Sequence, residues 1–158
     1  MQTLLTMAGQ LGERLRSRGE TVAVVETSAG GLIAAALLAQ PGASAFFLGG
    51  AVVYTRQARE ALLGITPVEM EGIRSASEPY ALLLARRLRQ RLGTTWGLAE
   101  TGAAGPSGNS YGDAPGHSCF AVSGPIEVVR TIETGSDDRW ENMRVFASTA
   151  LVLLSERL

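Results

Sequence analysis

The stretch Val22–Gly31, VAVVETSAGG, runs from an apolar segment into a glutamate, two hydroxyl side chains and a pair of glycines. A similar stretch occurs at Trp96–Pro106, WGLAETGAAGP, and a shorter one at Ile132–Ser136, IETGS. Apolar β-branched runs of this kind are typical of strands that are covered on both faces. The polar residues that follow either cap helices, by satisfying free backbone N–H groups, or form the walls of one polar site.

Length and composition limit the kind of protein this is. The 158 residues fit one domain, residues 1–158, and the 46% hydrophobic and 18% charged content predicts a folded chain. A formal net charge of −1 predicts no nucleic-acid partner. The longest apolar stretch, Gly30–Ala39, is too short to span a bilayer, and no signal peptide opens the chain. We therefore predict a cytoplasmic protein with no membrane partner.

The sequence offers little for metal, disulfide or cofactor chemistry. Cys119 is the single cysteine, which excludes an intrachain disulfide, and is expected in the core. His117 is the single histidine, so no zinc-type cluster is available and neither metal nor cofactor is predicted. A structural role is favoured for His117, although its position next to a glycine-rich loop leaves a pocket-lining role open. All 14 basic residues are arginine, because the chain contains no lysine.

Hydrophobic periodicity and turn residues predict helices that alternate with strands. The predicted helices cover Thr3–Arg18, Gly30–Ala39, Gln57–Leu63, Thr66–Gly72, a segment that begins after the N-cap Ser77, and a last helix that begins near Ser136 and has an apolar stripe from Trp140 to Leu158. The predicted strands cover Thr21–Val25, Phe46–Tyr54, Thr94–Ala99, Ser118–Val122 and Ile126–Glu133, with a glycine-rich loop at Gly102–Gly116. This order predicts an α/β fold, a three-layer α/β/α sandwich with a mixed central sheet.

The connections after the first and third predicted strands are candidate site loops. A hydroxyl at a strand end, beside a helix N-terminus, has N–H groups near it that can hold an anion or oxyanion. Val22–Gly31 lacks the Gly-x-Gly-x-x-Gly and Lys-Ser/Thr spacings of known phosphate loops. The small residues of Thr101–Asn109 let a ligand approach the backbone closely, although a mobile connection is the alternative. If both loops leave the same sheet edge, they flank one crevice.

Five motifs, in order along nearly the whole chain, resemble the C-terminal domain of the competence/damage-inducible protein CinA. They are ETSAGGLIAAAL, PGASAFFLGGAVVYTRQAREALLGI, SASEP, TGAAGPSG and GSDDRWENMR. The resemblance implies an α/β/α sandwich that forms a homo-oligomer. It also implies a small-molecule, nucleotide-like ligand, because free-standing members of the family are nicotinamide-nucleotide amidohydrolases. They hydrolyse the carboxamide of nicotinamide mononucleotide.

The same resemblance implies which residues form the site. Family enzymes use a serine nucleophile assisted by a tyrosine and a lysine. The nucleophile position falls on Thr27, with Ser28 next to it, the tyrosine is Tyr54, and the lysine position is Arg59. Arg139 matches a late family arginine and is expected to face a phosphate. The full ligand-binding set that the resemblance implies is Glu26, Gly30, Gly31, Thr101, Gly102, Ala103, Gly105 and Arg139.

The two departures from the family pattern predict weak or absent amidase activity. A guanidinium keeps its proton in proteins, so Arg59 cannot act as the base that a lysine provides. The methyl group of Thr27 restricts its side chain and crowds the path of attack.

Several alternatives to an inactive site stay open. Ser28 could be the nucleophile, Glu26 or Glu100 could be a base with a raised pKa, and Tyr54 could be a base if Arg59 lowered its pKa. A regulatory or interaction protein without a ligand is the alternative from another functional class.

Overall fold

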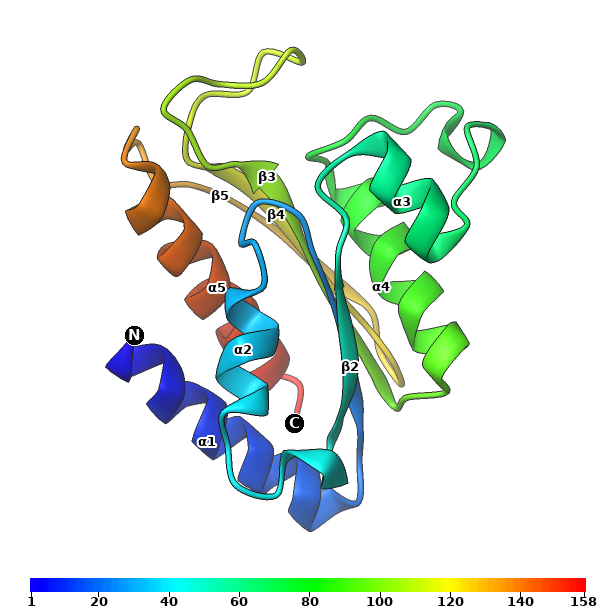
Figure 1. Cartoon of the computed structure of the whole chain (residues 1–158), viewed down its shortest axis with the longest axis vertical. Coiled ribbons are helices and arrows are strands. Elements are labelled where there is room, and N and C mark those ends of the chain that lie inside the picture. Colours follow the sequence, from blue (N-terminus) through cyan, green and yellow to red (C-terminus); the bar gives the residue numbers. More distant parts are fainter.

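The computed structural model describes all 158 residues and shows a five-stranded sheet with helices on both faces (Figure 1). The helices are α1 (Gln2–Arg18), α2 (Leu32–Leu38), α3 (Arg56–Leu63), α4 (Glu78–Leu92) and α5 (Arg139–Ser155). The strands are β1 (Val22–Glu26), β2 (Phe47–Val52), β3 (Trp96–Ala103), β4 (His117–Ser123) and β5 (Val128–Glu133). The predicted α/β/α sandwich is confirmed. No helix is both long and apolar enough to cross a bilayer.

The sheet is mixed, as predicted, and its strand order is β2-β1-β3-β4-β5. Strand β1 pairs in parallel with β2 and β3, whereas β3, β4 and β5 form antiparallel pairs. The carboxyl ends of β1, β2 and β3 therefore meet at one edge of the sheet. The long connection from β3 to β4 rises from this same edge, at the top of Figure 1. The candidate site loops are thus neighbours in space.

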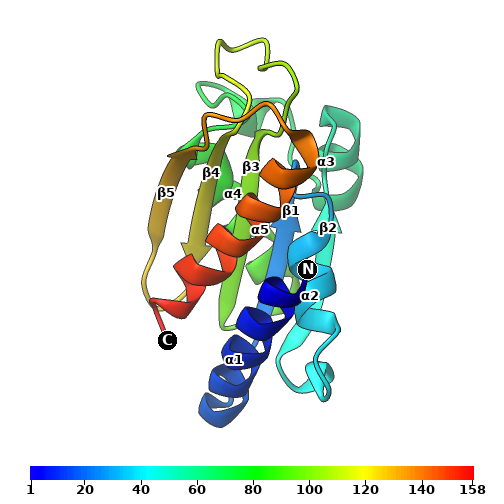
Figure 2. The ribbon, with the colours of Figure 1, turned by 90° about the vertical axis from the view of Figure 1, so that its left-hand side faces the viewer.

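Two apolar cores fill the sandwich, one on each side of the sheet. Helices α1, α2 and α5 cover one face, as Figure 2 shows, and there the rings of Phe120 and Phe146 meet edge to face at 6.4 Å. Helix α4 covers the other face with Tyr80 and Leu84. Every residue of β1 is buried, which confirms a strand covered on both faces. This rigid centre fixes where β1 and β3 deliver their polar residues.

Caps mark the starts of two predicted helices, at Ser77 as predicted and at Asp138, shortly after the predicted start near Ser136. The Ser77 hydroxyl accepts a hydrogen bond from the Tyr80 N–H at 3.3 Å, and the Asp138 carboxylate accepts one from the Glu141 N–H at 3.0 Å. These contacts satisfy backbone donors in the first turns of α4 and α5. The hairpin of β4 and β5 is also present.

Three local predictions are wrong. Strand β3 continues through Gly102 to Ala103, because those residues pair with Ser118 and His117 on β4, so the loop is shorter than predicted. The segment Thr66–Gly72 forms only a single 3-10 turn, Val68–Met70. Trp140, placed on the apolar stripe of the last helix, is 54% exposed because it lies in the first turn of α5, outside the core.

Candidate functional site

A cavity of about 250 Å³ lies at the edge where β1, β2 and β3 end. We call it the Thr27 cavity, and the residues of its wall that carry the argument are Thr27, Tyr54, Arg59, Tyr80, Thr101 and Gly102. The loops after β1 and β2, the first turns of α3 and the end of β3 contribute to it. The structure therefore brings Thr27, Tyr54 and Arg59 together beside Gly102, as the sequence predicts.

The side chain of Thr27 is buried and its hydroxyl has no hydrogen-bond partner. Only 6% of the residue is exposed, and Oγ1 is an unsatisfied buried atom. The backbone N–H of Thr27 is held by the carboxylate of Glu100 at 3.2 Å and by its carbonyl oxygen at 3.1 Å. An unsatisfied buried polar group costs about 1–3 kcal/mol. Thr27 lines the cavity, and its covered hydroxyl is left without a partner, which makes it a candidate contact for a ligand.

Arg59 places a buried positive charge in the same wall. The residue is 7% exposed, and its guanidinium lies over the ring of Tyr80, 5.4 Å from the centroid. Its Nε atom has no hydrogen-bond partner, and no carboxylate lies within ion-pair distance. Burial raises the pKa of Tyr80, and the nearby guanidinium offsets part of that rise. Buried arginines are normally paired, so this one is available to an anion.

A second hollow, of about 220 Å³, adjoins the Thr27 cavity, and we call it the Arg139 hollow. The two share Tyr54, Gly102 and Asn109 in their walls. Arg139 donates hydrogen bonds to the carbonyl oxygen of Gly105 and to the Tyr54 hydroxyl, the latter at 3.2 Å. Tyr54 is 60% exposed, and its hydroxyl is bound by Arg139 rather than by Arg59. The predicted residues Gly102, Ala103, Gly105 and Arg139 all line this hollow.

Glu26 lies behind the cavity, where it caps helix α2. Its carboxylate accepts hydrogen bonds from the N–H groups of Gly31, Ile33 and Ala34 at 2.8–3.1 Å. Gly30 and Gly31 have φ angles of +67° and +98°, and this left-handed turn suits glycine and brings the helix end onto the carboxylate. Burial raises the pKa of Glu26 to about 7. Its oxygens are engaged by the helix, which leaves them turned away from the cavity.

Glu100 and Ser28 form a second buried network behind the wall. The Glu100 carboxylate accepts hydrogen bonds from the N–H groups of Thr27 and Ala29 and from the hydroxyls of Ser28 and Ser118. Burial raises the pKa of Glu100. Neither Ser28 nor Glu100 lines the Thr27 cavity. In the first two stretches, therefore, the glutamates anchor backbone while the adjacent threonines, Thr27 and Thr101, face the cavity.

The pKa of Glu26 gives a pH-dependent stability. Because the folded value of about 7 exceeds the ordinary 4.5, the folded state holds a proton that the unfolded chain releases. The resulting stabilisation of the folded state is fully present below pH 4.5. It is lost as the pH rises to about 7, which lowers the free energy of unfolding by roughly 3 kcal/mol. Urea unfolding of Glu26→Gln, whose side chain does not titrate, should show a correspondingly smaller fall between these pH values. Equal falls in both proteins would contradict the expectation.

The third stretch does not reach the cavity. Thr134 donates a hydrogen bond to the Asn142 side chain at 2.6 Å, and Glu133 contacts Nδ1 of His117. Nε2 of His117 lies 2.9 Å from the carbonyl oxygen of Ala76. Both ring nitrogens thus face acceptors, so His117 joins β4 to β5 and to the segment before α4. Neither His117 nor Thr134 lines the Thr27 cavity.

Eight residues of the cavity wall lie outside the set of site residues predicted from the sequence: Val53, Thr55, Arg56, Ser75, Ala76, Tyr80, Asn109 and Tyr111. Tyr80 carried a usable signal, because it belongs to the apolar face of a predicted helix and yet has a hydroxyl. Asn109 and Tyr111 lie in the long β3–β4 connection, and no spacing rule predicts where such a loop folds back. Tyr111 is placed by the guanidinium of Arg74, which lies 5.5 Å from its ring and pairs with Asp113.

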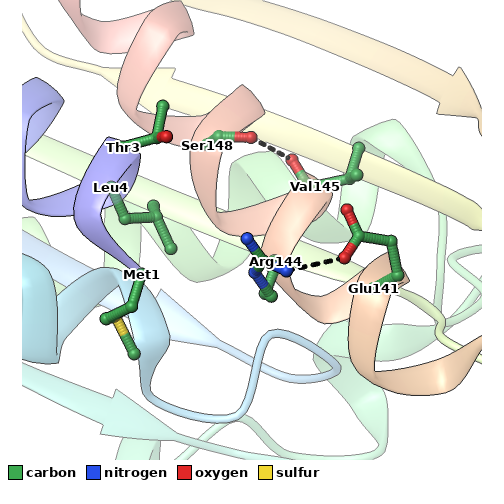
Figure 3. Close-up of a pocket in the computed structure, with 7 residues that line it drawn as sticks. All are labelled: Met1, Thr3, Leu4, Glu141, Arg144, Val145 and Ser148. Carbon is green, nitrogen blue, oxygen red and sulfur yellow. Dashed lines mark hydrogen bonds and ion pairs between the residues drawn. The ribbon is translucent and has the colours of Figure 1, made fainter.

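Figure 3 shows another hollow, of about 180 Å³, between the start of α1 and α5. Arg144 is its positive charge, and it is already paired with Glu141 at 2.9 Å. Both side chains are about half exposed, and no residue of the hollow has a buried atom without a partner. Its chemistry is therefore satisfied without a ligand, unlike that of the Thr27 cavity.

An α/β/α sandwich with a polar cavity at the carboxyl edge of its parallel strands is the class of protein that this fold and site define. The model of the CinA C-terminal domain matches residues 4–158. This chain belongs to that family.

Proteins and structures of the same family are similar over most of the chain. A CinA-like protein of Synechocystis sp. is 46% identical over 105 residues, which are 66% of this chain and 25% of that protein. A CinA-like protein of Trichormus variabilis is 35% identical over 156 residues, 97% of this chain and 38% of that protein. The chain therefore spans about a quarter to two fifths of these curated relatives.

Solved structures agree with the fold. A competence/damage-inducible protein of Agrobacterium tumefaciens has a TM-score of 0.89 and 28% identity, and the match covers 97% of this chain and 94% of that one. A CinA superfamily protein of Escherichia coli has a TM-score of 0.91 and 24% identity, with 98% of this chain and 90% of that chain covered.

Proposed function

We propose that the Thr27 cavity and the adjoining Arg139 hollow bind one small, anionic, nucleotide-like ligand, and that amide hydrolysis there is weak or absent. The observation that carries this proposal is a pair of unsatisfied buried atoms on two residues of one cavity wall, Thr27 Oγ1 and Arg59 Nε. A folded chain retains such costly groups where a ligand satisfies them. Membership of the CinA family supports a nucleotide-like ligand.

The same two residues argue against efficient catalysis. Arg59 lies where the resemblance places a lysine, and a guanidinium cannot give up its proton to act as a general base. General-base assistance supplies about 10²–10⁴-fold in rate. Glu26 and Glu100 do not replace it, because their oxygens are held by backbone N–H groups and serine hydroxyls behind the wall. The site therefore has groups that can bind a ligand but lacks the general base that efficient hydrolysis needs.

The Arg139 hollow suits the phosphate end of such a ligand. Arg139 is anchored by Gly105 and Tyr54, which orients its guanidinium without neutralising it. Guanidinium groups bind phosphate oxygens in a bidentate manner. Gly102 lies in the walls of both hollows, and a Cβ there would come within 2.4 Å of the His117 carbonyl oxygen. The absence of a side chain at Gly102 keeps β3 close to β4 beneath both hollows.

A working amidohydrolase and a ligand-free regulatory protein are the two competing proposals. The first needs a base, and Tyr54 is the candidate that faces both hollows, although its hydroxyl already accepts a hydrogen bond from Arg139. The second proposal is a homo-oligomer that acts through its surface. It does not account for the unpartnered buried atoms Thr27 Oγ1 and Arg59 Nε. The family resemblance makes a homo-oligomer part of all three proposals.

A thermal-shift panel of nicotinamide mononucleotide, adenosine monophosphate and inorganic phosphate tests the proposal. A ligand present at 100 times its Kd stabilises the folded state by about 2.7 kcal/mol. We expect a shift with at least one of the nucleotides that is larger than the shift with phosphate alone. The absence of any shift across the panel would favour the ligand-free regulatory protein.

A further inference from the structure

The wall of the Thr27 cavity is more specific than a general anion site. Two of its residues are more than nine-tenths buried, and each carries a buried atom without a hydrogen-bond partner: Oγ1 of Thr27 and Nε of Arg59. We infer that this end of the cavity seats a carboxylate of the ligand, in preference to a neutral carboxamide or a phosphate. This inference rests on the proposed function, because it concerns the same site and the same ligand.

The shape of the donors fits a carboxylate. A guanidinium is planar and presents a rigid fork of N–H groups that matches the two oxygens of a carboxylate. The guanidinium of Arg59 lies over the ring of Tyr80, 5.4 Å from its centroid, and its buried Nε has no hydrogen-bond partner. The Thr27 hydroxyl is a further donor at the same cavity. The set matches one small, flat, singly charged group.

Charge balance excludes the neutral alternative. A lysine could lose its proton and accommodate a carboxamide without a net charge, but Arg59 stays protonated. A carboxamide bound there would leave the buried guanidinium without a counter-charge, which is unfavourable in a poorly hydrated site. No side-chain carboxylate supplies that charge, because the oxygens of Glu100 and Glu26 are committed to other donors. A ligand carboxylate is then the matching counter-ion.

A phosphate brings too much charge to this end of the cavity. Phosphate monoesters carry a charge between about −1.5 and −2 near pH 7. Arg59 is the buried cation of this wall, whereas the second arginine that lines it, Arg56, is exposed to solvent and its charge is screened. Glu100 lies fully buried behind Thr27, where it accepts a hydrogen bond from the Thr27 N–H at 3.2 Å, so the doubly charged phosphate is disfavoured there more than a singly charged carboxylate. The exposed Arg139 hollow, with its glycine backbone, is the better seat for a phosphate. The ligand therefore has its carboxylate at Arg59 and its phosphate at Arg139.

Two probes that differ only in having a carboxylate or a carboxamide test the inference. Nicotinic acid mononucleotide carries a carboxylate where nicotinamide mononucleotide carries a carboxamide, and both carry one phosphate. Calorimetric titration of the unaltered chain should show the acid binding at least about tenfold more tightly than the amide. In Arg59→Gln the preference should disappear, and in Arg59→Lys it should shrink without disappearing. Arg144→Gln, the same exchange in the hollow of Figure 3, should keep the full preference.

The outcomes separate this inference from the proposed function. Equal binding of the two probes, or tighter binding of the amide, would overturn the carboxylate seat while the proposed function stands. A preference for the acid that persists in Arg59→Gln would also overturn it, because the guanidinium would not be its source. If neither probe binds, the proposed function fails and the inference falls with it. Should Arg59→Gln not fold, as judged by circular dichroism, Arg59→Met and Arg59→Lys carry the same comparison.

Discussion

The double variant Thr27→Ser/Arg59→Lys is expected to release ammonia from nicotinamide mononucleotide at least about 100-fold faster than the unaltered chain. The exchange supplies both a less crowded nucleophile and a base that can lose its proton, at two positions that line one cavity. Burial of the guanidinium at position 59 places the introduced amine in the environment that lowers a lysine pKa. The measurement is an ammonia-release assay on four proteins: the unaltered chain, both single variants and the double variant.

The rate gains of the two single variants, added together, should be much smaller than the rate gain of the double variant. A nucleophile and its base act as one unit, so the rate gains are far from additive. The unaltered chain should be close to inactive. Fast turnover that is abolished by Thr27→Ala would instead establish a threonine hydrolase that works without lysine. Fast turnover that survives Thr27→Ala would place the nucleophile elsewhere, and Ser28→Ala would then be the next variant.

Replacing Glu100 is expected to cause the largest loss of stability in the chain. Glu100→Ala should lower the free energy of unfolding by about 3–5 kcal/mol, because it removes the carboxylate that four buried donors share. Two of those donors, the Ser28 hydroxyl and the Ala29 N–H, have no other acceptor. The four donors lie on the loop after β1 and on β4, so the loss also releases Thr27 from its position. Urea unfolding followed by circular dichroism measures the change.

Glu127→Ala is the matched control, because Glu127 is a partly exposed carboxylate paired with Arg86 at the surface. Its removal should cost less than about 1 kcal/mol. Equal losses in Glu100→Ala and Glu127→Ala would show that the buried network contributes no more than a surface ion pair. Glu100 would then not be the residue that anchors the loop carrying Thr27.

The main features of the fold could be predicted from the sequence because they depend on local patterns. The uniformly apolar run of β1 predicts a strand with both faces covered, and that strand is buried throughout. Ser77 before a helical pattern predicts a cap, and its hydroxyl accepts the expected hydrogen bond. The parallel edge that gathers Thr27 and Thr101 follows from the order of helices and strands.

It could not be predicted in the same way that, in the first two Glu-Thr pairs, the glutamate anchors backbone while the threonine lines the cavity. Sequence alone left open whether Glu26 and Glu100 cap backbone or face a site, because both uses need a carboxylate at a strand end. Only the three-dimensional partners show that both glutamates turn away from the cavity. Tyr111 was missed for a related reason. Its position depends on Arg74, which lies 37 residues earlier in the chain and is brought near by the fold.

The most direct test of a carboxylate-binding Thr27 cavity is a crystal structure of this protein grown with nicotinic acid mononucleotide. We expect the ligand in the Thr27 cavity, with its carboxylate within hydrogen-bond distance of Thr27 Oγ1 and of the Arg59 guanidinium, whose Nε, like Thr27 Oγ1, has no partner without it. The phosphate should lie in the adjoining hollow beside Arg139. A ligand bound elsewhere, such as between α1 and α5, with Thr27 Oγ1 and Arg59 still unpartnered, would contradict this assignment.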